Sequence, residues 1–258
     1  MTEDIILRVD QISKSFQTSE GTQKVIQDIS LEVMKKSVLC ILGYSGCGKT
    51  TLLRIMSALE KPDEGNILVD NSNYCTPSKD VLLLFQDFNQ LFPWKSILLN
   101  IVHALLITKT ALDRKSAVLE AEAVLKEVGL YEYRNRYPRQ LSGGMKQRAA
   151  VARALALKPK ILLMDEPFAS LDMVTRHNLQ KLVREKCLKY DISVVFVTHG
   201  VEEAVLIGDR IVIMKANPGE IGFTLDNTYI ATGSSVDKMK MMSIIMEQLN
   251  NQTNQEEG

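Results

Sequence analysis

The stretch VLCILGYSGCGKTT, residues 38–51, constrains the fold of this chain more than any other. The apolar run 38–42 leads into Gly43 and a loop that ends in GKTT, and the next residues, LLRIMSAL, have the apolar spacing of a helix. A strand, a glycine-rich turn and a helix start form the context in which the pattern GxxxxGK[ST] predicts a phosphate-binding loop. The alternative is a glycine-rich turn that matches by chance, and the flanking strand and helix disfavour it.

The residue types in this loop suit the chemistry of phosphate binding. Glycines let the backbone curl so that its N–H groups point inward, and the helix start adds the positive end of a dipole. Lys49 supplies a positive charge to the β- and γ-phosphates, and the Thr50 hydroxyl can ligate Mg²⁺. Because a helix N-terminus lowers thiol pKa values, we also expect Cys47 to be reactive. The expected phosphate-binding residues are Gly43, Tyr44, Ser45, Gly46, Cys47, Gly48, Lys49, Thr50 and Thr51.

Composition excludes several other classes of protein. Lys plus Arg and Asp plus Glu both number 31, and a chain with no basic excess is not typical of nucleic-acid binding. Apolar runs such as 81–85 are far shorter than the roughly 20 residues that cross a bilayer, and MTEDIILRVD lacks the features of a signal peptide. The 4 cysteines form no CxxC pair, which predicts free thiols in a reducing compartment. We therefore expect a soluble cytosolic protein.

Apolar periodicity predicts an α/β fold with an inserted helical lobe. Strands are expected at 5–9, 29–33, 67–69, 81–85, 161–164, 193–197 and 211–214, with KSFQTSEGTQK (14–24) as a polar loop. Helices are expected at 174–188 and 201–207, and this alternation indicates a parallel sheet that binds ligands at the carboxyl ends of its strands. Between the two groups of strands, helical patterns take over, and we place an inserted helical subdomain at about 88–157, with Asp113 capping one helix.

The C-terminal part differs in composition from the rest of the chain. We expect one domain at 1–233, followed at 234–258 by an amphipathic helix, KMKMMSIIMEQLN, and a disordered tail, NQTNQEEG. A methionine cluster in that helix is expected to pack on the core rather than to bind a partner. Its members are Met239, Met241, Met242 and Met246.

Two further motifs carry candidate chemistry. ILLMDE, residues 161–166, reads as a buried strand that ends in two carboxylates. Asp165 can hold Mg²⁺ through its water shell and Glu166 can polarise an attacking water, with a helix cap as the alternative role. LSGGMKQR, residues 141–148, places Ser142 as an N-cap residue before Gly143 and Gly144, which predicts a second anion-binding helix start.

In this order, the motifs resemble those of the ATP-binding subunit of an ABC transporter, over about residues 5–222. The resemblance implies a P-loop NTPase (RecA-like) fold with a mixed sheet, an antiparallel β subdomain and an inserted α-helical subdomain. It also implies ATP and Mg²⁺ as cofactors.

The same resemblance implies roles for single residues. Phe16 would stack on adenine, and Gln86 would reach Mg²⁺ and sense the transmembrane partner. Residues 170–172 would lie across a dimer, and His199 would contact the γ-phosphate. Taken singly, Phe16 could be an ordinary strand aromatic, Gln86 a solvated loop residue and His199 a structural histidine. The implied catalytic residues are Glu166, His199 and Gln86, and the implied metal site is Thr50, Gln86 and Asp165.

The resemblance also implies partners. A second copy would pair head-to-tail, so that Ser142 of one copy faces the γ-phosphate held by Lys49 of the other, and the pair would dock on transmembrane permease subunits. A solute-binding protein would be an indirect partner, no nucleic acid would take part, and the chain would sit peripherally on the cytoplasmic face of the cell membrane. QDFNQLFPW (86–94) and NPGEI (217–221) resemble importers of nitrate, sulfonates, taurine and thiamine-pyrimidine precursors. Three departures, at Lys36-Ser37, Ala58 and Asn71, lie on the scaffold.

Rival functions remain open at this point. A GTPase would need an NKxD-type base reader, and a kinase an acceptor site and a phosphate lid, neither of which the sequence indicates. An importer ATPase for another solute and a soluble, non-transport ABC ATPase are the nearer alternatives. A nucleotide-binding regulator without hydrolysis is disfavoured because Glu166 and His199 are both present.

Overall fold

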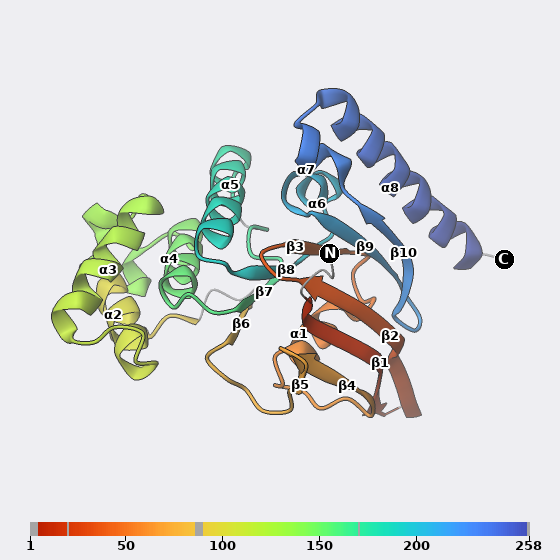
Figure 1. Ribbon diagram of the computed structural model, residues 1–258, viewed down its shortest axis with the longest axis horizontal. Helices are drawn as coiled ribbons and strands as arrows, with labels where there is room; N and C mark the ends of the chain where they lie inside the picture. The colour runs from red at the N-terminus through yellow and green to blue at the C-terminus, as the bar shows by residue number, and fades with distance from the viewer. Residues whose placement is uncertain (1–4, 20, 86–89, 170, 257–258) are drawn as a thin grey trace.

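The computed structural model describes residues 5–19, 21–85, 90–169 and 171–256, and its strands form two sheets (Figure 1). The larger sheet has the strand order β10-β9-β3-β8-β7-β6 and the smaller has the order β2-β1-β4-β5. The larger consists of β3 (Val38–Leu42), β6 (Val81–Leu84), β7 (Ile161–Asp165), β8 (Ser193–Thr198), β9 (Arg210–Lys215) and β10 (Glu220–Asp226). Only β10 runs antiparallel to its neighbour among the described pairs of this sheet. The predicted mixed α/β sheet is thus confirmed.

Strands β3, β7 and β8 are buried along their whole length, which explains their unbroken apolar sequences. Alternate side chains of β3 enter two cores, because successive side chains of a strand point to opposite faces. Leu42 packs with the helices of one core, and Ile41 packs with α1 and the smaller sheet in the other. The register places Leu42 beside Thr198 and Asp165 beside Val197, so the carboxyl ends of three strands meet at one edge.

The smaller, antiparallel sheet corrects one expectation. It comprises β1 (Ile5–Thr18), β2 (Gly21–Met34), β4 (Glu64–Val69) and β5 (Ser72–Asn73). The stretch 14–24 was expected to be a polar loop, but 14–18 and 21–24 within it pair as antiparallel strands, with Phe16 opposite Gln23. The prediction was wrong because both faces of this hairpin are largely exposed, so the hairpin lacks the apolar alternation of a half-buried strand.

The helical insertion lies between β6 and β7 in the chain, to the left of the sheet in Figure 1. It contains α2 (Ile97–Ile107), α3 (Arg114–Glu127), the 3-10 turns η2 (Tyr131–Tyr133) and η3 (Pro138–Gln140), and α4 (Gly143–Ala156). Asp113 caps α3 as predicted, since its carboxylate accepts the backbone N–H of Ser116 at 2.7 Å. The limits proposed for this subdomain, 88–157, and for the domain 1–233 stay predictions.

The remaining helices flank the sheet. They are α1 (Lys49–Met56), α5 (Met173–Lys189), α6 (Val201–Ile207), α7 (Thr228–Thr232) and α8 (Ser235–Glu256). Helix α8 lies against α6, α7 and β9. In the part of the chain that the structure describes, no helix is long and apolar enough to cross a membrane.

Helix α8 differs from its prediction in two ways. It continues to Glu256, so the stretch expected to be a disordered tail is mostly helical, because extending a helix costs less than starting one. The methionine cluster is also divided: Met241 is buried and Met242 packs against the core, whereas Met239 and Met246 are exposed. The expectation that all four pack on the core was therefore wrong for two of them.

Candidate active site

The loop between β3 and α1 has the backbone conformation that its glycines predict. Gly46 has φ 86° and Gly48 has φ 92°, in the left-handed region that side chains disfavour. Gly48 is the N-cap residue of α1, and among the described residues no side chain caps that helix start. A Cβ added at Gly43 would lie 2.9 Å from the Met214 carbonyl oxygen, so close packing also demands glycine there. The loop therefore offers a bare helix start to an anion.

Lys49 lies beneath this loop with 6% of its surface exposed. Its Nζ donates hydrogen bonds to the carbonyl oxygens of Gly43 and Tyr44, both at 2.7 Å. The loop thus surrounds the ammonium group of Lys49. A buried positive charge with partners this close has a fixed position, which suits an anion-binding site.

Cys47 does not have the reactive thiol that was expected. It is only 1% exposed, and burial raises the pKa of its thiol above the ordinary value. The nearby Lys49 ammonium acts in the opposite direction but is the smaller influence. The prediction from the helix N-terminus was wrong, because the side chain points into the core rather than to solvent.

Asp165 meets Thr50 at the carboxyl end of β7. The Thr50 hydroxyl donates a hydrogen bond to Oδ2 of Asp165 at 2.9 Å. Burial raises the pKa of this carboxyl, and the adjacent Glu166 adds to the rise, while the Thr50 hydrogen bond and Lys49 oppose it. A hydroxyl and a carboxylate side by side match the oxygen ligands of Mg²⁺, and a cation would offset the cost of burying the charge. These residues therefore fit a magnesium site.

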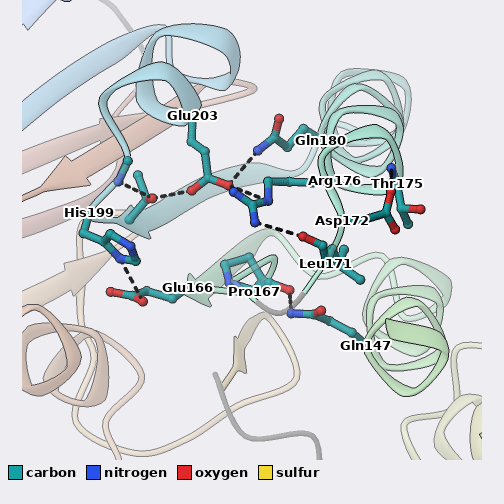
Figure 2. A network of polar contacts seen from close by, with 12 residues as sticks. Gln147, Glu166, Pro167, Leu171, Asp172, Thr175, Arg176, Gln180, His199 and Glu203 are labelled. Carbon is teal, nitrogen blue, oxygen red and sulfur yellow. Dashed lines mark hydrogen bonds and ion pairs between the residues drawn. The ribbon is translucent and has the colours of Figure 1, made fainter. Parts of the chain in front are cut away.

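Glu166 and His199 come from neighbouring strands and face one another (Figure 2). His199 Nδ1 lies 3.1 Å from Glu166 Oε2, and the His199 side chain is 65% exposed. Glu166 has φ 43°, an uncommon conformation for a residue with a side chain. Its backbone N–H donates to the Val197 carbonyl at 3.1 Å, which holds this strained residue in place.

One hollow is bordered by both the phosphate loop and the Glu166–His199 pair. It has a volume of about 410 Å³ and is bounded by Leu42, Gly43, Tyr44, Ser45, Glu166, His199 and Leu249. The sequence predicted the chemistry of most of these residues but gave no sign that Leu249, from the far end of α8, borders the same space. A second cavity, of about 720 Å³, lies beside Glu166 and His199 between α5 and α6.

The other expected site residues lie apart from this hollow. Ser142 caps α4 by accepting the Met145 N–H at 3.3 Å, and α4 belongs to the helical insertion. A Cβ at Gly143 would meet nothing within 4 Å, whereas one at Gly144 would lie 2.8 Å from Leu171. Phe16 is 38% exposed on the β1–β2 hairpin. Gln86 and position 170 lie outside the described residues.

Sequence reasoning missed the polar side chains behind His199. Glu203, in the first turn of α6, accepts hydrogen bonds from Thr198 and Gln180 and lies near Arg176. Glu203 stands three residues after Gly200, the N-cap residue of α6, which is the spacing of a capping box. Its side chain does not cap that helix start, however, so this spacing was no signal of the contacts that Glu203 makes.

Comparison with known proteins reveals extensive similarity. A sequence model of the family described as "ABC transporter" matches residues 26–169. An uncharacterised ABC transporter ATP-binding protein of Methanocaldococcus jannaschii is 42% identical over 83% of this chain and 79% of its own length. A nitrate import ATP-binding protein of Synechococcus elongatus is 37% identical over 82% of this chain and 77% of its own.

A bicarbonate transport ATP-binding protein of Synechocystis sp. is 40% identical over 83% of this chain. The chain spans only 32% of that relative's length. Among solved structures, the chain is similar to a dimeric ATP-binding cassette in a post-hydrolysis state, bound to ADP and Pi. The TM-score is 0.78 at 30% identity, over 86% of this chain and 98% of the other.

Proposed function

The chain belongs to the ABC transporter family and is an ATPase of that family, and from this we propose that it powers the import of a solute across a membrane. The carrying observation is that the phosphate loop, the Thr50–Asp165 pair and the Glu166–His199 pair converge at one edge of the sheet. Each has a separate part in hydrolysing ATP, and their convergence argues against a protein that only binds nucleotide.

Lys49 and the loop would hold the ATP phosphates. The Lys49 ammonium donates to two carbonyls of its own loop, and its charge would also attract a γ-phosphate oxygen bound in that loop. Thr50 and Asp165 would hold Mg²⁺, with Gln86 as a third ligand. When bound, the metal supplies positive charge to the phosphate oxygens. Phe16 would stack its exposed face on adenine.

Glu166 and His199 would act on the reaction itself. The Glu166 carboxylate would orient the attacking water and accept its proton, because it lies beside the phosphate loop in the same hollow. His199 would contact the γ-phosphate, and its close contact with the Glu166 carboxylate would keep both side chains aligned. Catalysis would therefore consist of positioning and charge stabilisation.

A second copy would complete the site. Ser142, Gly143 and Gly144 form an open helix start that does not reach the phosphate loop of its own chain in the described contacts, so its anion would be the γ-phosphate held by another copy. The dimeric state of the solved relative supports this arrangement. Two-fold symmetry would make two equal head-to-tail sites.

Light scattering tests this dimer. Glu166→Gln keeps the shape of the side chain but slows hydrolysis, so the purified variant should be monomeric without nucleotide and dimeric with ATP. Adding Ser142→Arg should return it to a monomer, because a long cation would occupy the partner's site. An unchanged mass on adding ATP to Glu166→Gln would contradict the head-to-tail arrangement.

Membership of the ABC transporter family supports a proposal about the import partners. We propose docking on two permease subunits at the cytoplasmic face of a membrane, with a solute-binding protein as an indirect partner. Relatives named for import of nitrate and aliphatic sulfonates and for bicarbonate transport support a solute of this kind, and taurine, itself a sulfonate, is a further candidate. An importer ATPase for another solute remains the second candidate, since the identities are 37–40%.

Uptake by the source cells tests this function. Lys49→Ala at the native locus should abolish accumulation of one labelled solute among nitrate, taurine, an alkanesulfonate and bicarbonate. The matched control, Lys61→Ala, changes an exposed lysine between α1 and β4 and should leave uptake intact. Normal uptake of all four solutes in the Lys49→Ala strain would contradict an importer of this branch.

A further inference from the structure

The Glu203 carboxylate joins two parts of the molecule through its two oxygens (Figure 2). Oε2 accepts a hydrogen bond from the Thr198 hydroxyl. Oε1 accepts one from Gln180 Nε2 at 3.0 Å and lies 3.7 Å from Arg176 Nε. The Glu203 side chain is 18% exposed, and such a shielded carboxylate interacts more strongly than one on the surface. Thus one side chain of α6 contacts both the end of β8 and helix α5.

Oε2 of Glu203 acts, through the Thr198 hydroxyl, on the backbone on both sides of His199. Thr198 precedes His199 in the chain, and its hydroxyl oxygen also accepts the backbone N–H of Gly200 at 2.9 Å. The Thr198 hydroxyl therefore links the Gly200 N–H to the Glu203 carboxylate, and His199 lies between the two residues, Thr198 and Gly200, that these hydrogen bonds hold. A fixed backbone at both neighbours limits the directions that the exposed imidazole can take, and Nδ1 lies 3.1 Å from Glu166.

The second oxygen reaches the segment that leads from β7 to α5. Arg176 Nη2 donates a hydrogen bond to the Leu171 carbonyl at 2.9 Å. Its Nε is buried and has no hydrogen bond among the described residues, and it lies 3.7 Å from Glu203 Oε1, within reach of an ion pair. Leu171 directly precedes Asp172, the N-cap residue of α5. Glu203 and Arg176 therefore tie the His199 loop to the chain that follows Glu166.

We propose that Glu203 is a positioning residue for ATP hydrolysis, which holds His199 against Glu166 and couples this pair to the segment around Leu171. The inference rests on the proposed roles of Glu166 and His199. In the part of the chain that the structure describes, the hydrogen bonds of Glu203 go to Thr198 and Gln180 and not to the phosphate loop, so ATP binding does not depend on this carboxylate. Loss of the carboxylate therefore lowers the rate of hydrolysis and leaves nucleotide affinity unchanged.

Steady-state hydrolysis by the purified full chain separates these two effects. Glu203→Ala should lower kcat about ten- to a hundredfold, the effect of misplacing a catalytic group, with the KM for ATP within about twofold of wild type. Glu203→Gln keeps an oxygen for Thr198 but presents an amide to Arg176, so its kcat should fall less. The matched control is Glu202→Ala on the same helix, where the side chain is 59% exposed and pairs with Lys238. Its kcat should equal that of wild type.

Histidine NMR supplies a readout that a purely structural role would not move. The chain has 3 histidines, so ¹³C-labelled histidine gives a resolvable spectrum. Glu203→Ala should shift or broaden the His199 ring signal. The His103 signal, from a ring that packs 5.4 Å from Phe92 in the helical insertion, should stay unchanged. An unchanged His199 signal in folded Glu203→Ala protein would overturn the proposal.

Glu166→Gln separates failure of this inference from failure of the proposed function. If Glu166→Gln hydrolyses ATP at the wild-type rate, the proposed roles at the site are wrong, and the inference falls with them. If Glu166→Gln is inactive and Glu203→Ala has the wild-type kcat, only the inference is overturned. Should Glu203→Ala fail to fold, Thr198→Val removes the same hydrogen bond with little change of shape. A wild-type kcat for Thr198→Val would then overturn the inference.

Discussion

Replacing Asp165 with asparagine should make the protein more stable and less active. Burial is the largest influence on this carboxyl and raises its pKa, so the folded state favours the protonated form. Between the ordinary pKa of an aspartate and the raised folded value, the folded chain binds more protons than the unfolded chain. The free energy of unfolding therefore falls as the pH rises through this window, and the penalty is complete at neutral pH. Asparagine carries no charge and can still accept the Thr50 hydrogen bond, so it removes the penalty.

The size of the gain follows from the same linkage. The gain for Asp165→Asn is the part of the cost of burying the charge that the Thr50 hydrogen bond and the Lys49 ammonium do not offset. Solvent screening reduces it little, because Asp165 is only 4% exposed. For a chain of 258 residues, 1 kcal/mol raises Tm by roughly 2–4 °C. ATP hydrolysis should fall at the same time, since Asp165 is a proposed ligand of Mg²⁺.

Urea unfolding of both proteins between pH 4 and pH 7 tests the sign. The difference in unfolding free energy between Asp165→Asn and wild type should be largest at pH 7 and should shrink as the pH falls, because the raised pKa lets the folded wild-type carboxyl gain its proton before the unfolded one does. The control is Asp226→Asn, whose side chain is 78% exposed and which should show little difference at any pH. An Asp165→Asn protein less stable than wild type at pH 7, or a gain independent of pH, would refute the reasoning.

Three further predictions concern single positions. Gly43→Ala should lower the free energy of unfolding by about 1–3 kcal/mol in urea titrations, because the new Cβ would lie 2.9 Å from the Met214 carbonyl oxygen; an unchanged midpoint would contradict this packing. Iodoacetamide should label the exposed Cys75 well before the buried Cys47, as peptide mass mapping can establish; equal rates would show that the loop opens readily. Phe16→Ala should weaken ATP binding about tenfold in calorimetry, and Phe16→Trp should restore it, if the ring stacks on adenine. Equal affinities would make Phe16 an ordinary strand aromatic.

Much of the central sheet could be predicted from the sequence, because its strands are buried on both faces. The apolar runs that become β3, β7 and β8 are unbroken for that reason, and their ends were placed within a residue or two. Helix α6 was predicted with its observed limits, 201–207, since it starts at a glycine and ends before one. These signals are local, so sequence alone was sufficient.

Elements outside the core were harder to predict. The hairpin at 14–24 is stabilised by backbone pairing between two exposed strands, which leaves no apolar pattern. Strand β10 was not assigned, although Ile221, Phe223 and Leu225 alternate along it. The end of α8 has weak helix-forming residues, and the helix continues there from a segment that packs against α6. The hairpin and β10 thus depend on backbone pairing with the strand next to them in sequence, and α8 depends on packing against a more distant helix.

The candidate site likewise has features that could be predicted from the sequence and features that could not. The phosphate loop could be predicted because its glycines, lysine and threonine are adjacent in sequence. The approach of Glu166 to His199 depends on the pairing of β7 with β8, which places residues far apart in the chain within 3.1 Å. The burial of Cys47 depends on the core beneath the loop, and the contact of Glu203 with Arg176 depends on how α5 and α6 pack. Sequence patterns carry no direct signal of such contacts.

Single-turnover hydrolysis by Glu166→Gln tests most directly whether Glu166 activates the attacking water. Wild type and variant are each loaded with labelled ATP and Mg²⁺, bound nucleotide is measured by filter binding, and labelled phosphate is followed over time. We predict equal occupancy and a rate of phosphate formation about 10²- to 10⁴-fold lower in the variant, the usual contribution of a general base. Phosphate formation at the wild-type rate by fully occupied Glu166→Gln protein would contradict that role.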